Sequence, residues 1–351
     1  MLVDHFTYGL APSAVPAEIA NLEAAGVDGW FVAEADRDPT IAATLAAEHS
    51  ERIAIGTGVA LAFARSPMTT AYMSHGLQEI ARGRFVLGLG SQIRPHIERR
   101  FAMPFTPPIA RMREYITAVR SIWDAWVTGG DLDFRGEHYQ HTLMPPAFRP
   151  PTDGLVCPPI YLAAVGPKMT ALAGELADGI MCHPFSGARY IEEVTLPRVR
   201  DGILGAERSG SDVTVSASVL VATGPTDEAI HADIETARER IAFYASTPAY
   251  RAVLDTYGWG ELHTDARRLT REGRWTELAA LIDDEMLSTF VVVGAPDEVG
   301  AELARRFGGL IDRVNLSTGH RFSAEEWATL IGTLRPADPV TPPERAPRSS
   351  S

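Results

Sequence analysis

The chain has 351 residues, of which 45% are apolar, and this is enough to bury the core of one large domain or two ordinary ones. The 45 acidic residues outnumber the 32 basic ones and give a net charge of -13, which argues against a broad nucleic-acid-binding or acidic-membrane-binding surface. Cys157 and Cys182 are the only cysteines, so a disulfide framework and a four-cysteine zinc site are excluded. No apolar run reaches membrane-spanning length and no signal segment follows Met1, so we expect a cytoplasmic protein that does not enter the membrane.

Short β-rich runs alternate with amphipathic helical patterns from residue 1 to about residue 335. Candidate strands begin at Val3, Gly29, Arg52, Arg84, Pro159, Asp178, Val213 and Asp312. Eight such units, with strands that are near-continuous apolar runs, predict an α/β fold whose parallel sheet closes into a (β/α)8 TIM barrel. An open, doubly wound sheet is the alternative fold.

Two stretches interrupt this alternation within the predicted 1–335 barrel domain. Residues 129–154 are rich in glycine and proline and predict a long loop or a small hairpin. Residues 231–285 have a helical pattern and are interpreted as an insertion over the mouth of the barrel or as an oligomer contact. The run "STFVVVG" after them is a ninth strand candidate, which we interpret as accessory, and the polar, proline-rich residues 337–351 predict a disordered tail.

The active site of such a barrel lies at the carboxyl ends of its strands. These ends hold Tyr8, Glu34, Val59 to Leu61, Gly90 to Gln92, Ala164 to Gly166, His183, Thr223 and Ser317. The set lacks paired metal ligands, since Asp4 and His5 lie on opposite faces of a strand and His138 and His141 are interpreted as solvated loop residues. No nucleophile elbow is present either. The sequence therefore predicts a bound organic cofactor and no metal.

Two segments are candidates for holding an anionic part of that cofactor. In "IYLAAVGPKMT", a helix begins at Pro167, and its free amides lie beside Lys168, the only lysine of the chain. The alternative for this segment is an ordinary turn with an exposed lysine. After the Gly88, Gly90 and Ser91 turn, residues Arg94, His96, Arg99 and Arg100 predict either an anion clamp or a solvated face with partners such as Glu98.

Nearly the whole chain resembles the luciferase-like flavin and deazaflavin oxidoreductases, in particular the actinobacterial branch that uses coenzyme F420. The resemblance depends on five stretches: "IGTGVALAFARSP", "GRFVLGLGSQIRPHIERRF", "ARMREYITAVRSIWDAW", "IYLAAVGPKMTALAGELADG" and "AFYASTPAYRAVLDTYGW". It implies a pocket at the carboxyl end of the barrel for an isoalloxazine-type ring, with the phosphate of the cofactor toward the outer loops.

The resemblance also implies the residues that contact the cofactor. It places a non-proline cis peptide at Gly58 and Val59, next to Ala60, behind the ring. Gly90 and Ser91, together with Ala164, Val165, Gly166 and Lys168, match the contacts to the ring edge and the phosphate. This chain departs from the pattern after the second strand, where Asp36 and Arg37 replace a pair that often contains a histidine. It also departs from the sugar-phosphate branch, in which a glutamate often follows the fourth strand, because Ile93 occupies the nearest position.

Glu34 and His183 are the candidate catalytic residues. His183 would donate a proton or hydrogen bond to the substrate or ring, or be a loop histidine, and Glu34 would orient the cofactor or pair with Arg65. The resulting hypothesis is a homodimeric oxidoreductase that moves a hydride between F420 and a small organic molecule. The alternatives are a monooxygenase that uses reduced FMN and a non-catalytic flavin-binding protein.

Overall fold

Eight parallel strands close into a barrel in the computed structural model, which describes residues 1–152, 154–209 and 213–335. The strands are β1 (Leu2–Thr7), β2 (Gly29–Val32), β3 (Ala54–Thr57), β5 (Phe85–Gly90), β8 (Ile160–Ala164), β9 (Gly179–Cys182), β10 (Thr214–Ala222) and β12 (Arg313–Ser317). Each strand pairs with the next in this order, and β12 pairs back with β1. The predicted (β/α)8 barrel is confirmed, and the open sheet is wrong. The predicted tail, 337–351, lies outside the described residues.

The third strand of the barrel is interrupted near its carboxyl end. β3 ends at Thr57, the peptide bond between Gly58 and Val59 is cis, and β4 (Ala60–Leu61) then continues beside β5. The cis peptide expected at this position is confirmed. The break turns residues 58 to 61 into a bulge at the end of the barrel where the active site is expected.

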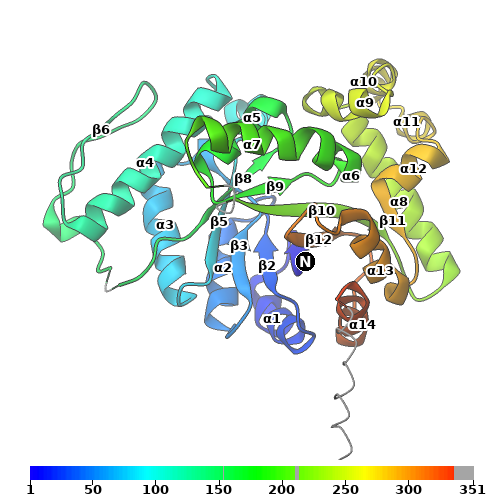
Figure 1. The fold of residues 1–351 in the computed structure, drawn as a ribbon, viewed down its shortest axis with the longest axis horizontal. Coiled ribbons are helices and arrows are strands. Elements are labelled where there is room, and N and C mark those ends of the chain that lie inside the picture. The colour runs from blue at the N-terminus through cyan, green and yellow to red at the C-terminus, as the bar shows by residue number, and fades with distance from the viewer. Residues whose placement is uncertain (153, 210–212, 336–351) are drawn as a thin grey trace, which may run out of the picture.

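Helices cover the outside of the barrel (Figure 1). They are α1 (Val15–Ala24), α2 (Pro39–Glu48), α3 (Pro67–Ile80), α4 (Pro108–Thr128), α5 (Pro167–Leu176), α6 (Gly187–Tyr190), α7 (Leu196–Gly205), α13 (Pro296–Phe307) and α14 (Ala324–Leu334). Several begin with proline in the first turn, where the missing N–H costs no hydrogen bond. Side chains of Asp38, Ser66 and Ser323 cap α2, α3 and α14 by accepting from the first free amides.

The seventh unit of the barrel is enlarged by helices that gather on one side of the molecule (Figure 1). Between β10 and α13 lie α8 (Asp227–Ala245), α9 (Arg251–Tyr257), α10 (Leu262–Glu272), α11 (Trp275–Ala279), α12 (Asp284–Phe290) and β11 (Val291–Val293). The helical segment thus begins and ends a few residues outside the predicted 231–285, and it has an apolar core of its own. The accessory strand is confirmed, because β11 pairs only with β10, but the first residues of "STFVVVG" end α12 instead.

Within the predicted interruption at residues 129–154, the described residues include a small hairpin, which projects on the opposite side of the molecule (Figure 1). Its two short antiparallel strands are β6 (Phe134–Arg135) and β7 (Gln140–His141). Glu114 on α4 anchors the turn, because its carboxylate accepts from the backbone N–H groups of Glu137 at 3.0 Å and His138 at 2.7 Å. No helix among the described residues is both long and apolar enough to cross a bilayer.

The interior of the barrel is filled in layers. Apolar side chains of Phe31, Val86, Tyr161 and Met181 form its middle, with Phe6, Val59 and Ala163 packed against them. Below them, toward the amino ends of the strands, Arg313 donates to both carboxylate oxygens of Asp4 at 2.5 and 2.8 Å, and both side chains are buried. The expectation that Asp4 and His5 face opposite ways is confirmed, since His5 contacts Glu18 outside the barrel. The interior is therefore closed at the amino end.

Candidate active site

The residues predicted to bind the cofactor or to act in catalysis lie at one end of the barrel. Glu34 follows β2, Gly58 to Ala60 join β3 to β4, Gly90 and Ser91 end β5, Ala164 to Lys168 join β8 to α5, and His183 follows β9. Because all these strands are parallel, their carboxyl ends meet at the same end of the closed sheet. The topology therefore places these residues at one end of the barrel, and the site that they would form and their individual roles stay predictions.

Glu34 holds the bulge in the third strand. Its backbone N–H donates to the carbonyl of Val59 at 3.3 Å, and its carboxylate accepts from the N–H of Leu61 at 2.7 Å. Arg65 donates to both carboxylate oxygens, at 2.5 and 3.0 Å, and the Glu34 side chain is only 7% exposed. The pairing with Arg65 that the sequence left open is thus present. A carboxylate that accepts three hydrogen bonds from the bulge and from Arg65 positions the bulge.

Small residues are required where the strand ends approach one another. A Cβ at Gly90 would lie 2.5 Å from a methyl carbon of Val59, and a Cβ at Gly58 would lie 2.5 Å from the ring of Phe6. Non-bonded carbon atoms do not approach one another this closely, so a side chain at either position would clash. The bulge therefore packs directly on β1 and β5. The strand ends thus form a continuous wall behind any ligand at this end of the barrel.

The amino end of α5 is the candidate anion site. Gly166 is its N-cap residue and no side chain caps it, in contrast to α2 and α3. Lys168 is exposed in the first turn, and in the part of the chain that the structure describes it forms no ion pair. A positively charged side chain beside free helix amides favours a bound anion.

The arginines after β5 do not form one clamp. Arg94 pairs with Glu98 at 3.1 Å and lies over the ring of Phe105, and Arg100 donates to the carbonyl of Ala35. The expected partner Glu98 is therefore present, and the solvated-face alternative holds for Arg94. The place after β2 where similar proteins carry a histidine holds an exposed ion pair instead, between Asp36 and Arg37 at 2.8 Å.

His183 faces the interior of the barrel, because Met181 two residues earlier belongs to the interior layer. Its Nδ1 accepts from the backbone N–H of Phe185 at 3.2 Å, so the proton of the neutral ring is on Nε2. Burial lowers its pKa from 6.5 to about 3. Desolvation therefore opposes the imidazolium, and the part that His183 plays in catalysis stays a prediction. His183 can donate a hydrogen bond from Nε2 at physiological pH.

Three residues of the enlarged seventh unit, which the sequence did not single out, reach this end of the barrel: Tyr244 and Tyr250 lie beside His183, and Arg240 lies at the end of β12. The rings of Tyr250 and Tyr244 have centroids 4.4 and 4.6 Å from the His183 ring. Arg240, one turn before Tyr244 on α8, donates to the hydroxyl of Ser317 at the end of β12 at 3.3 Å. The sequence signal for this group was the four-residue spacing of Arg240 and Tyr244 in a predicted helix, which indicates that both lie on the same helix face. It did not show which strand end this face would contact.

Tyr8 completes this group from the first strand. Burial raises the pKa of Tyr244, and the Arg240 guanidinium opposes a rise in pKa both there and at Tyr8, whose side chain is 69% exposed. The charge of Arg240 is therefore close to both rings. We call Tyr8, His183, Arg240, Tyr244 and Tyr250 the mouth cluster.

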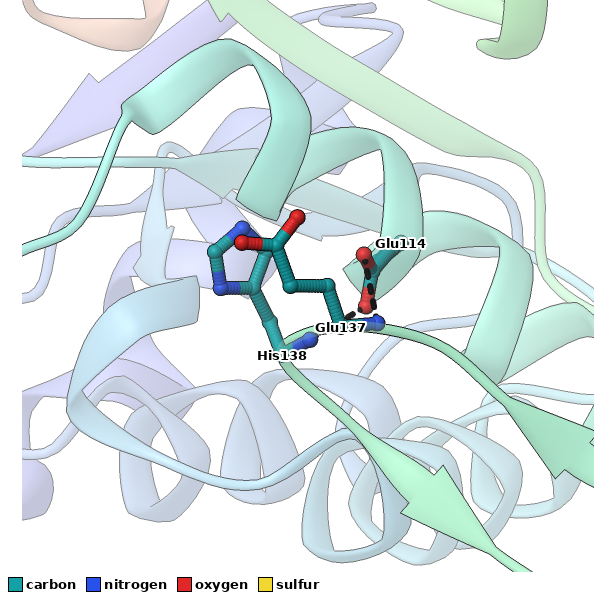
Figure 2. A group of neighbouring side chains, drawn as sticks. All are labelled: Glu114, Glu137 and His138. Carbon is teal, nitrogen blue, oxygen red and sulfur yellow. Dashed lines mark hydrogen bonds between the residues drawn. The ribbon is translucent and has the colours of Figure 1, made fainter.

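A separate group of possible metal ligands lies where α4 meets the hairpin. Figure 2 shows Glu137 and His138 beside Glu114. Both oxygens of Glu114 accept from backbone N–H groups, and these bonds outweigh the effect of burial and hold its pKa below the usual range. The group therefore functions as a loop anchor. The two hairpin histidines are not fully solvated as expected: both are partly buried, and Nε2 of His141 is sealed from solvent without a partner.

Comparison with known proteins agrees with this architecture. The chain is 47% identical over 301 residues to an uncharacterised protein of Mycobacterium tuberculosis, a match that covers 86% of this chain and 88% of that protein. A second protein of that organism, whose name provisionally assigns it to the coenzyme F420-dependent oxidoreductases, is 31% identical over 343 residues, 92% of this chain and 96% of the relative.

Among solved structures, the coenzyme F420-dependent tetrahydromethanopterin reductase of Methanopyrus kandleri shares the fold. It superposes with a TM-score of 0.76 at 21% identity, over 94% of this chain and 97% of that chain. The family model described as luciferase-like monooxygenase matches residues 5–313. The chain therefore belongs to the luciferase-like monooxygenase family.

Proposed function

We propose that this protein is an oxidoreductase that transfers a hydride between coenzyme F420 and a small organic substrate. The observation that carries the proposal is the uncapped amino end of α5, with the single lysine of the chain beside it, adjoining strand ends made of small residues. The relative that is 31% identical over 92% of this chain and is named for F420 supports the choice of cofactor.

The residues present fit a flat ring that carries a phosphate. Gly58, Val59 and Ala60 would lie behind the ring, and Gly90 and Ser91 would lie along its edge. The amides at Ala164 to Gly166 and the ammonium group of Lys168 would hold the phosphate, since a helix amino end and a cation both favour an anion. Among the described residues at this end of the barrel there is no metal-ligand group that would compete for this role.

The bound deazaflavin would supply or accept the hydride, and the protein would supply position and electrostatics. Glu34, paired with Arg65, keeps the bulge behind the ring in place. His183 offers a neutral N–H donor from the floor of the mouth, and it can orient a substrate oxygen without itself gaining or losing a proton near pH 7. Holding donor and acceptor carbons in contact is the larger part of such catalysis.

Two other functions remain as alternatives, each with its own observation. The name of the family favours a monooxygenase that uses reduced FMN, whose reacting ring differs from that of F420 by one atom. The ion pair between Asp36 and Arg37 at the place of a family histidine favours a cofactor-binding protein without catalysis. We also infer a cytoplasmic homodimer, and light scattering measures its mass.

The deciding experiment is mass spectrometry of the cofactor retained by the protein after expression in a host that makes both F420 and FMN. The proposal expects F420 in the denatured supernatant and its reduction or reoxidation by a substrate. Retention of FMN alone would replace the proposal with the monooxygenase. Retention of F420 that no substrate or reductant turns over would replace it with the binding protein.

A further inference from the structure

We propose that the mouth cluster binds the oxyanion of the substrate, and that the substrate of this enzyme is a flat, apolar molecule carrying a carboxylate. The proposal rests on the proposed function for the identity of the reaction. It depends on three properties of the cluster, namely its hydrogen-bond donors, its unpaired charge and its aromatic walls.

Every polar group in the cluster can donate a hydrogen bond, and none is a carboxylate. Nε2 of His183 carries a proton, because Nδ1 accepts from Phe185. The hydroxyls of Tyr8, Tyr244 and Tyr250 donate to no residue in the described part of the chain. The side chains of Tyr244 and Tyr250 are only partly buried, and neither of their hydroxyl oxygens is enclosed by protein without a hydrogen-bond partner. These hydroxyls are therefore not sealed inside the protein and are available to donate to a ligand.

Arg240 gives the cluster a positive charge that no described acidic group neutralises. Its one hydrogen bond goes to the hydroxyl of Ser317, whereas Arg65 and Arg313, the other arginines near the barrel interior, each hold a carboxylate with two N–H groups. A half-buried guanidinium without a counter-ion is less favourable than one that holds a carboxylate. A ligand carboxylate would supply the missing partner, and bidentate pairing of this kind is among the strongest polar contacts available.

The walls of the cluster set the shape of the ligand. The rings of His183 and Tyr250 are tilted by 31° to each other with centroids 4.4 Å apart, and Tyr244 meets His183 edge to face. Phe185 packs 5.9 Å from Tyr244 behind them. Such rings favour a flat apolar body, which can stack or meet their edges. The donors then lie around the polar end of that body, so a carboxylate on a flat molecule satisfies both features.

The test compares three aromatic probes of similar size by calorimetric titration at pH 7.5, with and without bound F420. Benzoate carries the anion, acetophenone a neutral acceptor and benzylamine a cation. We expect benzoate to bind at least about tenfold more tightly than acetophenone, with benzylamine weakest, because a charge-assisted contact is stronger than a neutral one. Added salt should reduce the preference for benzoate.

Variants assign the preference to the cluster. Arg240→Met keeps much of the length of the side chain and should lose the benzoate preference, and Tyr250→Phe should weaken benzoate binding a few-fold. The matched control is Arg267→Met, which removes another arginine that has no ion pair among the described residues. Arg267 is exposed and lines a separate groove with Arg251, Thr264 and Arg271. This control should bind benzoate as the wild type does.

Each of the following results would overturn the proposal. One is acetophenone binding as tightly as benzoate, and another is benzoate binding unchanged in Arg240→Met. The third is an Arg240→Met protein that loses affinity for F420 while keeping its affinity for benzoate, which would assign the cluster to the cofactor. Selective benzoate binding by a protein that retains no F420 would support the oxyanion site and count only against the proposed function.

Discussion

The amino end of the barrel and the mouth cluster at its carboxyl end treat polar groups in opposite ways. At the amino end, Asp4 and Arg313 satisfy each other with two hydrogen bonds and are sealed beneath apolar side chains. At the carboxyl end, Arg240 and the phenols beside it have donors with no described carboxylate to accept them. A satisfied buried pair contributes to a unique, rigid fold, whereas unsatisfied donors are retained where a ligand completes them. The amino end should therefore govern stability, and the carboxyl end should govern binding.

Replacing Arg313 should produce the largest loss of stability. Arg313→Met leaves the Asp4 carboxylate buried without a partner, and we expect the free energy of unfolding to fall by about 3 to 5 kcal/mol. Urea titration followed by circular dichroism measures this. The double variant Asp4→Asn, Arg313→Met should recover part of the loss, because no charge is left uncompensated. Arg240→Met, at the other end, should change stability by less than about 1 kcal/mol. Equal losses at the two ends would contradict the comparison.

Replacing Lys168 should have the largest effect on cofactor binding. A helix amino end contributes up to about 2 kcal/mol to binding an anion, and a charge-assisted hydrogen bond contributes about 1.5 to 3 kcal/mol. Lys168→Ala should therefore weaken the affinity for F420 by about tenfold to a few hundredfold at low ionic strength, with a smaller loss as salt rises. Lys168→Arg, which keeps the charge, is the control. If Lys168→Ala binds F420 with the affinity of the wild type, the phosphate must bind at another site, such as Arg99.

The sequence predicted the barrel because its signal is local and repeated. Each strand is a short apolar run closed by small or polar residues, and the chain contains eight such units, so an error in one strand does not change the topology. The predicted element boundaries that were wrong lie where the sequence has no periodic pattern of apolar residues. The run "STFVVVG" has the composition of one strand, yet its first residues end α12, because Asp283 caps that helix and fixes its start.

The site was predicted only in the parts that follow strands directly. Gly58, Gly90 and Lys168 could be predicted because each lies near the carboxyl end of a strand. A parallel barrel brings these strand ends together. Arg240, Tyr244 and Tyr250 reach the same end from helices that enlarge the seventh unit, and no local pattern shows which strand end they will meet. The pKa of His183 was also beyond the sequence, because it depends on burial by Tyr244 and Tyr250.

Adding one methyl group at the amino end tests how tightly that end is packed. A Cβ at Gly29 would lie 2.3 Å from a carboxylate oxygen of Asp4 and 2.7 Å from a guanidinium nitrogen of Arg313. Gly29→Ala should therefore lower the free energy of unfolding by about 1 to 3 kcal/mol. Gly76→Ala in α3 is the matched control, since nothing lies within 4 Å of its added carbon and alanine favours a helix. Equal stability of the two variants in urea titration would show that the amino end has room to adjust.

The smallest predicted effect is a pH dependence of stability from His183. Its pKa is about 3 in the folded protein and 6.5 as the ordinary value, so the unfolded chain binds the proton first as the pH falls. Well above pH 6.5 both states are neutral and His183 adds no pH dependence. Between pH 7 and pH 5 the wild type should therefore lose up to about 2 kcal/mol that His183→Phe, which keeps an aromatic ring but cannot titrate, does not lose. Other groups titrate alike in the two proteins, so the difference between their urea midpoints at pH 7, 6 and 5 isolates this residue. Parallel changes in the two proteins would mean that the imidazolium is tolerated at the mouth, and that His183 is solvated there instead of held neutral by Tyr244 and Tyr250.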